Sequence, residues 1–244
     1  MKNIRLQMCL FRDMNNGTQH IKLSYSAFCA VAIYQHFKEG VEYSFTPKIL
    51  YNSMLNKPLN TYVNNSEIKG IKLGLEELET KHWIKYKKQG TTYTITESNL
   101  FNDKDGTFFV IPLEYINRIL KQKCNKITLL HHYLYLVSTI NIKQKVGFTS
   151  REAIANVLNV SSLKTITLRN KKLEELGVIK FITRKGKDIN NHFINMTNIY
   201  GLPEDIKLLE KYKEKSIKDE TKRINQEITK FNNLYDDNND ENPF

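Results

Sequence analysis

The hydrophobic and polar positions of the chain follow one pattern that occurs twice. Residues 75–78 and 173–176 both read Leu-Glu-Glu-Leu, and each is followed by a short apolar strand, a basic turn with glycine and a second alternating strand. Upstream, residues 16–23 and 105–113 each precede an apolar helix. Because an internal repeat indicates a repeated supersecondary unit, the sequence predicts one unit at about 3–98 and again at about 101–200.

Each unit begins with a helix of the kind found in a protein core. Residues 127–140 are apolar nearly all round, and residues 25–37 have a similar pattern. A helix that is apolar on every side is typical of an element surrounded by neighbours. We therefore expect these two helices at the centre of their units.

The second unit then shows the signals of two short helices. Thr149 and Glu152 form a capping-box pattern at the start of one helix. Ser161 or Ser162 can cap the next helix, which ends at Gly177. Two short helices joined by a tight turn predict a helix-turn-helix.

A β-hairpin follows directly, with strands at 178–183 and 191–196 and a basic tip at 184–190. In the first unit the matching helices are expected at 47–55 and 67–78, separated by a polar loop. The pattern predicts an α+β fold of two tandem winged-helix domains. We place them at residues 1–100 and 101–202.

Residues 203–244 form a separate tail. Pro203 suits the first turn of a helix, and the helix that follows is highly charged, with a thin apolar stripe and an acidic run at 236–241. The stripe consists of Ile217, Ile224, Ile228 and Phe231. Such a helix needs a partner or stays loosely ordered.

The net charge of the chain is +11, and it is unevenly distributed. Residues 1–202 carry a net charge of +14, and residues 203–244 carry −3. A basic body attracts a polyanion, most simply nucleic acid, through counterion release. A membrane partner is not expected, because there is no long apolar run, signal peptide or lipidation motif, so we expect a cytoplasmic protein.

The sequence offers little for catalysis. It has no phosphate-binding glycine loop, nucleophile elbow or paired-carboxylate motif. Cys9, Cys29 and Cys124 lack the spacing of a zinc site or disulfide framework. His131 and His132 are adjacent on a helix and cannot both ligate one metal. We therefore expect a non-enzymatic protein without a cofactor or metal.

The helix-turn-helix geometry places the second helix of a unit in the major groove and the hairpin near the backbone or minor groove. Arg169 is the best candidate for a bidentate contact with guanine. The alternative is an ordinary solvated basic helix face. The predicted contacts in the second unit are Ser162, Lys164, Thr165, Thr167, Leu168, Arg169, Lys171, Lys172, Arg184, Lys185 and Lys187.

The first unit has a weaker set of candidates. Gly70 and Gly74 lie four residues apart on its second helix, so they would allow dimerisation or a close approach to DNA. Trp83, Tyr86 and Tyr93 could stack on unpaired bases, although core packing is the expected role of Trp83. The predicted contacts are Ser66, Lys69, Lys72, Lys85, Lys87 and Lys88.

Residues 109–115, 149–158 and 171–180 carry a resemblance to a known group of proteins. The second unit resembles the winged-helix domains of plasmid replication initiators and phage replisome organisers, including the DnaD-like primosomal proteins of low-GC bacteria. It departs from them in a longer turn before Thr165 and in Asn170, which stands where such helices have an apolar residue.

Two functions follow from this resemblance. In the first, the protein binds origin repeats in double-stranded DNA, and residues 203–244 recruit a replisome protein. In the second, it is a transcriptional regulator of a mobile element, with the first unit or the tail as a dimer surface. A nuclease or primase would need an acidic metal-binding cluster that the sequence lacks.

Overall fold

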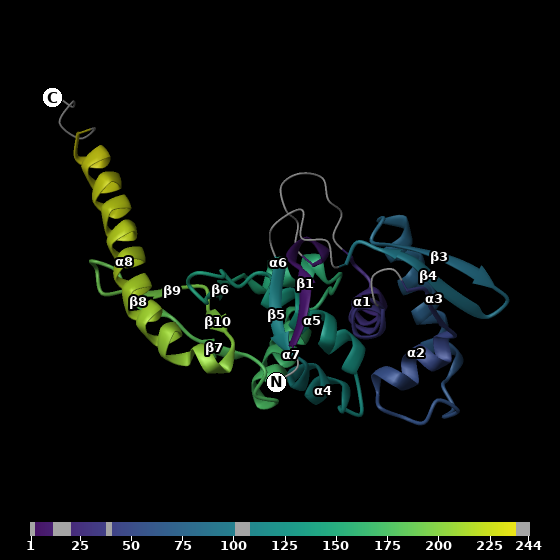
Figure 1. Cartoon of the computed structure of the whole chain (residues 1–244). Helices are drawn as coiled ribbons and strands as arrows, with labels where there is room; N and C mark the ends of the chain where they lie inside the picture. The colour runs from purple at the N-terminus through teal and green to yellow at the C-terminus, as the bar shows by residue number, and fades with distance from the viewer. Residues whose placement is uncertain (1–2, 12–20, 38–40, 101–107, 238–244) are drawn as a thin grey trace.

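The computed structural model describes residues 3–11, 21–37, 41–100 and 108–237. The fold is a mixed α+β arrangement in which two units follow the same order of elements (Figure 1). The first unit contains β1 (Asn3–Gln7), a 3-10 turn η1 (Met8–Leu10), α1 (Ser24–His36), β2 (Tyr43–Phe45), α2 (Pro47–Met54), α3 (Asn65–Thr80), β3 (Ile84–Gln89) and β4 (Thr92–Ser98).

The second unit begins with another strand and short helix. Its elements are β5 (Phe108–Pro112), α4 (Leu113–Leu120), α5 (Lys126–Ser138), β6 (Gly147–Phe148), α6 (Arg151–Val157), α7 (Leu163–Glu175), β7 (Lys180–Ile182), β8 (Lys185–Lys187), β9 (Phe193–Asn195) and β10 (Ile199–Gly201). The sheet orders are β2-β4-β3 and β6-β10-β7, so in each unit the short early strand pairs with the last strand.

The first helix of each pair ends at the same kind of turn residue, although the connection to the second helix spans 55–64 in the first unit and 158–162 in the second. The first helix of each pair ends in Leu-Asn, with Asn56 and Asn159 both at φ 51°. Thr46 caps α2 through its side chain, and Ser150 caps α6. The expected capping residue Thr149 is therefore wrong by one position, because its hydroxyl shares a hydrogen bond with the Tyr200 hydroxyl at 2.8 Å.

The ends of α3 and α7 show which residues correspond. His82 and Gly177 both adopt positive φ, and the backbone amides of Trp83 and Val178 donate to the carbonyls of Leu78 and Leu173. Residues of the two helices therefore match at an offset of 95. The Leu-Glu-Glu-Leu match in the sequence is displaced by three residues, because α3 has 16 residues and α7 has 13.

The two units share one continuous apolar core. Strand β1 pairs antiparallel with β5 along its whole length, from Asn3 opposite Pro112 to Gln7 opposite Phe108, and α1 packs against α5. By element order β1 is the counterpart of β5. The expected match of 16–23 with 105–113 is therefore wrong, and residues 16–20 and 105–107 lie outside the described residues. Figure 1 shows β1 and β5 side by side near the middle of the molecule, with the two hairpins at opposite ends.

The tail is a long helix, α8 (Ile206–Asp237), which follows a 3-10 turn η3 (Pro203–Asp205). Its first half packs on the second hairpin, where Leu209 is fully buried with Val146 and Ile199. This part of the tail therefore has a partner within the chain. Residues 238–241 of the acidic run lie outside the described part. Within the described residues, no helix is both long and apolar enough to span a membrane.

Candidate functional site

The outer surface of α7 is open to solvent and basic. Leu168 is 58% exposed there, an unusual position for a leucine in a helix that packs on a core. The exposed residues of this surface, which we call the α7 face, are Lys164, Thr167, Leu168, Lys171 and Lys172, and exposed Glu175 at its end pairs with Lys172 at 3.3 Å. Ser162 precedes it as an exposed N-terminal residue whose side chain forms no capping hydrogen bond.

The α7 face also includes one residue of α6 that was not expected from the sequence. The guanidinium of Arg151 donates to the Thr167 hydroxyl at 3.4 Å, and Arg151 is exposed. The sequence feature that could have indicated Arg151 is its position as the first residue of α6, the helix before the one that carries the expected contacts. The face therefore carries a cation from each helix of the pair.

Arg169 lies away from this exposed surface. It is half-buried, and burial lowers its pKa. Its neighbour Asn170 bonds to Nε2 of His132 on α5 at 2.7 Å. Burial, followed by smaller effects that include the charge of Arg169, lowers the pKa of His132 to about 3. Arg169 is thus close to buried α5 and is not among the most exposed residues of α7, and Thr165 is half-buried as well.

The polar contact between His132 and Asn170 explains why α7 has an asparagine where similar helices have an apolar residue. Both histidines of α5 are buried, and His131 lies 3.3 Å from the Ser24 hydroxyl of α1. Asn170 stands at an apolar position because its side-chain oxygen meets the buried imidazole. Both histidines therefore belong to the core.

The strand from β7 through β8 has two different faces. Ile182 packs with Leu209, Arg184 forms an ion pair with Glu220, and Gly186 lies against Thr221, so these alternate residues face α8. The Arg184 guanidinium also donates to the Thr197 carbonyl at 2.8 Å, and the residue is only 8% exposed. The expectation that Arg184 lies at an exposed hairpin tip is therefore wrong.

The other residues of this strand face α7. Phe181 and Thr183 line a cleft of about 570 Å³ together with Thr167 and Lys171 of α7. Strand alternation places Lys185 and Lys187 on the same side, and both are exposed. The tip of the hairpin is at 188–192, where the Asp188 amide donates to the His192 carbonyl. The basic residues therefore lie along β8, nearer the cleft than expected.

Phe193 of β9 completes this side of the hairpin. It pairs with Lys187 in the β8–β9 ladder and is 74% exposed. The Lys187 ammonium lies 5.2 Å from the centre of its ring, a cation–π distance. We call Lys185, Lys187 and Phe193 the open face of the second hairpin.

The corresponding surface of the first unit is less basic. Lys69 and Leu73 are exposed at the positions of Lys164 and Leu168, but Glu76 stands where the second unit has Lys171. Lys72 is half-buried, and the Ser66 hydroxyl donates to the capping Asn64 side chain at 2.7 Å. The face of α3 therefore mixes both signs of charge.

The lysines of the first hairpin have acidic or aromatic neighbours. Lys85 pairs with Glu97 at 2.7 Å, and Lys87 lies 3.8 Å from Glu42. Lys88 lies 5.5 Å from the centre of the Tyr93 ring. These exposed contacts reduce the local positive charge that a polyanion would meet.

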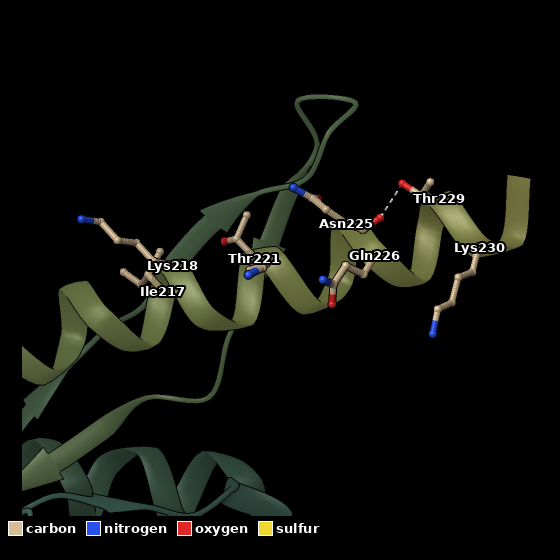
Figure 2. Close-up of a pocket in the computed structure, with 8 residues that line it drawn as sticks. Ile217, Lys218, Thr221, Asn225, Gln226, Thr229 and Lys230 are labelled. Carbon is tan, nitrogen blue, oxygen red and sulfur yellow. Dashed lines mark hydrogen bonds between the residues drawn. The ribbon is translucent and has the colours of Figure 1, made fainter.

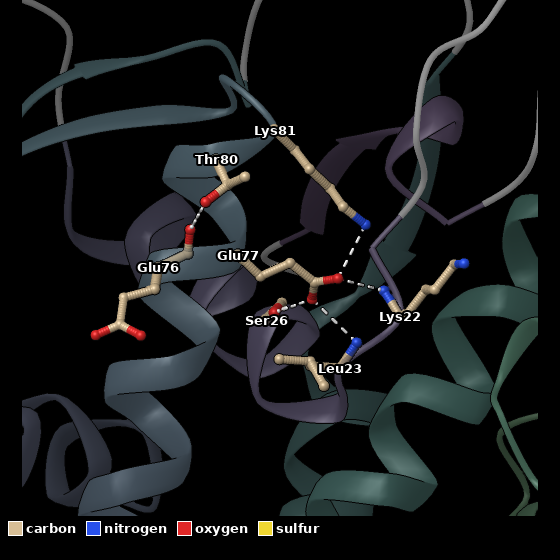
Figure 3. A network of polar contacts seen from close by, with 7 residues as sticks. All are labelled: Lys22, Leu23, Ser26, Glu76, Glu77, Thr80 and Lys81. Atoms are coloured by element: carbon tan, nitrogen blue, oxygen red, sulfur yellow. Dashed lines mark hydrogen bonds and ion pairs between the residues drawn. The ribbon is translucent and has the colours of Figure 1, made fainter.

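Glu77 ties α3 to the start of α1 (Figure 3). Its carboxylate accepts from the Lys22 and Leu23 amides at 2.9 and 3.0 Å, from the Ser26 hydroxyl at 2.5 Å, and from the Lys81 ammonium at 2.9 Å. Burial raises the pKa of this carboxyl, but the hydrogen bonds outweigh it and leave the pKa below its ordinary value. This residue is a helix-to-helix clamp.

The two glycines of α3 allow the same close contact. A Cβ on Gly70 would lie 2.4 Å from the Tyr25 ring, and one on Gly74 would lie 2.7 Å from the Tyr25 backbone. Both positions are covered by α1 in the same chain. The expectation that they form a dimer surface or a DNA contact is therefore wrong.

The aromatic residues of the first hairpin fill the core. Tyr93 is fully buried and Trp83 is 6% exposed, which confirms the core role expected of Trp83. Tyr86 is half-buried, and burial together with nearby Glu79 raises its pKa to about 12. None of the three forms an open stacking platform.

Comparison with known proteins identified no relative. No family model, no curated protein and no solved structure matches this chain. The features of the chain that bear on its function are therefore the α7 face, the cleft beside it and the open face of the second hairpin.

Proposed function

We propose that this chain is a non-enzymatic cytoplasmic protein that binds double-stranded DNA sequence-specifically. In this proposal its two units are winged-helix domains at 1–100 and 101–202, and it serves as a plasmid or phage replication initiator or replisome organiser. One observation carries the DNA proposal: α7 presents an exposed basic face on the same side as the open face of the second hairpin.

The chemistry of this surface suits a duplex. A helix and an adjacent hairpin can reach a major groove and its neighbouring backbone together. Lys164, Lys171 and Lys172 supply phosphate contacts, and Leu168 can meet a thymine methyl group. The surface offers no described group of three metal-ligating side chains, so the proposal requires no bound metal.

The replication role is supported by the resemblance and by the shape of α8. This helix continues past Asn225, which accepts from the Ile189 amide at the hairpin tip, and its distal part is the segment we propose to contact a replisome protein. A homodimer through this segment would instead suit a regulator.

The test is a DNase footprint of the full-length protein on the DNA that flanks its own gene. A Lys164→Ala/Lys171→Ala variant removes two cations of the α7 face, and Lys207→Ala/Lys211→Ala removes two exposed cations of α8 as a matched control. We expect several repeats to be protected by the wild type and the control, but not by the first variant. Protection of a single palindrome would contradict the initiator role and favour a transcriptional regulator. No protection would contradict DNA binding.

A further inference from the structure

The second hairpin is held along one face by α8 (Figure 2). At its base Arg184 pairs with Glu220 at 3.3 Å. In the middle a Cβ on Gly186 would lie only 2.9 Å from the Thr221 hydroxyl, so strand and helix touch there. At the tip the Ile189 amide donates to the Asn225 side chain at 3.0 Å. Three contacts spread along the hairpin fix its orientation.

The open face of the same hairpin has a composition that its own packing does not explain. Phe193 leaves most of a large apolar ring in water, although burying such a side chain typically stabilises a folded protein. Lys185 and Lys187 on the paired strand are exposed beside it. An exposed aromatic ring between cations suits an apolar target surrounded by negative charge.

We propose that Phe193 is a wedge that enters the minor groove of the bound duplex and partly unstacks a base step. This proposal rests on the proposed function, because it assumes that the duplex lies across α7 and the second hairpin. Apolar side chains inserted from the minor groove unstack base steps and kink the duplex by about 20–90°. Lys185 and Lys187 would contact phosphates beside the inserted ring, and α8 would support the hairpin from behind.

The first hairpin provides a contrast within the chain. Its tip is Gly90 and Thr91, and its strand tyrosines are fully buried, in the case of Tyr93, or half-buried, in the case of Tyr86. Among the described residues, no long helix packs on its far face. Within that part of the chain, the second hairpin is the one that combines an exposed aromatic ring with a supporting element.

The experiment uses full-length protein and a 40-bp duplex that contains the footprinted site, with 2-aminopurine at successive adenines. Fluorescence of this base rises when it is unstacked, and anisotropy of an end label gives affinity. The variants are Phe193→Ala, Phe193→Leu and Lys185→Ala/Lys187→Ala. Phe148→Ala is the matched control, because Phe148 is also exposed, at 56%, but lines a pocket with Tyr212 and Ser216 of α8.

We expect wild type and Phe148→Ala to raise the fluorescence at one or two adjacent positions. Phe193→Ala should lose this rise and bind about tenfold more weakly, the effect of one lost stacking contact. Phe193→Leu should keep part of the rise. The double lysine variant should lower the slope of log affinity against log salt concentration by about two.

The outcomes separate the wedge from the proposed function. If the wild type binds the duplex but no position is unstacked, or if Phe193→Ala keeps the rise, the wedge is wrong and DNA binding stands. A wild type that fails to bind any duplex contradicts the proposed function first. An unchanged affinity and fluorescence in Phe193→Ala would also exclude DNA as the partner of this ring.

Discussion

The two units have the same order of elements and the same Leu-Asn end to the first paired helix, yet their second helices make different contacts. In α3, Gly70, Gly74 and Glu77 are all occupied by contacts with α1. The residue that corresponds to Glu77 in α7 is Lys172, which is exposed. One unit thus commits all three positions to internal packing, while in the other the matching Thr165 and Arg169 are half-buried and Lys172 is exposed beside its ion-pair partner Glu175.

The two hairpins also differ in what covers their far faces. The far face of the first hairpin carries exposed pairs such as Lys85 with Glu97, which contribute little to stability. The far face of the second is covered by α8, with Leu209 fully buried. A repeated fold can therefore divide stability and binding between its copies, and the following experiments test that division.

The largest effect is expected from removing the apolar anchor of α8. Leu209→Ala should lower the free energy of unfolding by about 2–5 kcal/mol, because it leaves a cavity under the second hairpin. Leu208→Ala is the control, since Leu208 is 47% exposed. Urea denaturation of both variants measures the difference. Equal stability of the two variants would show that α8 does not cover this hairpin.

A smaller effect is expected at the helix contact of the first unit. Gly74→Ala should destabilise the protein by about 1–3 kcal/mol, because the new methyl group meets the Tyr25 backbone. This opposes the gain of about 1 kcal/mol in helix propensity. Arg169→Ala at the equivalent position should change stability by less, as measured by the same unfolding curves. A Gly74→Ala protein more stable than the wild type would refute the close contact of α1 and α3.

The second unit should respond to acid through His132. Its pKa in the folded protein is about 3, below the 6.5 of an ordinary histidine. The unfolded chain therefore binds the extra proton between these values, and stability should fall as pH drops from about 6.5 toward 3. The slope should reach about 1.4 kcal/mol per pH unit. In His132→Gln that part of the pH profile should be flatter, and an unchanged profile would contradict a neutral buried His132.

Much of the fold was predictable because local signals agreed. The core helices, the paired helices and both hairpins lie within a few residues of their expected places, since periodicity and turn residues such as Gly177 reported on them. The mixed α+β class is confirmed. The domain boundaries stay a prediction, and the pairing of β1 with β5 required a contact between distant segments that no local pattern encodes.

The candidate site was harder to predict because it depends on the direction of each side chain. Arg184 and Lys185 are adjacent and equally basic, but strand alternation puts the first against Glu220 and leaves the second exposed. The helix periodicity of α7 likewise turns Arg169 toward α5. The role of α8 could not be inferred from its thin apolar stripe, because its partner surface forms only when the hairpin folds.

The most direct test of whether α7 is the DNA-binding helix is a reciprocal exchange at the equivalent positions Glu76 and Lys171. Binding of a duplex with the footprinted site is measured by anisotropy over a salt series for Lys171→Glu, Glu76→Lys and the double variant. We predict that Lys171→Glu weakens binding at least about tenfold and lowers the slope of log affinity against log salt concentration by one or more. The double variant should recover little of this loss. Unchanged binding by Lys171→Glu, or full recovery by Glu76→Lys, would contradict the claim that α7 is the DNA-binding helix.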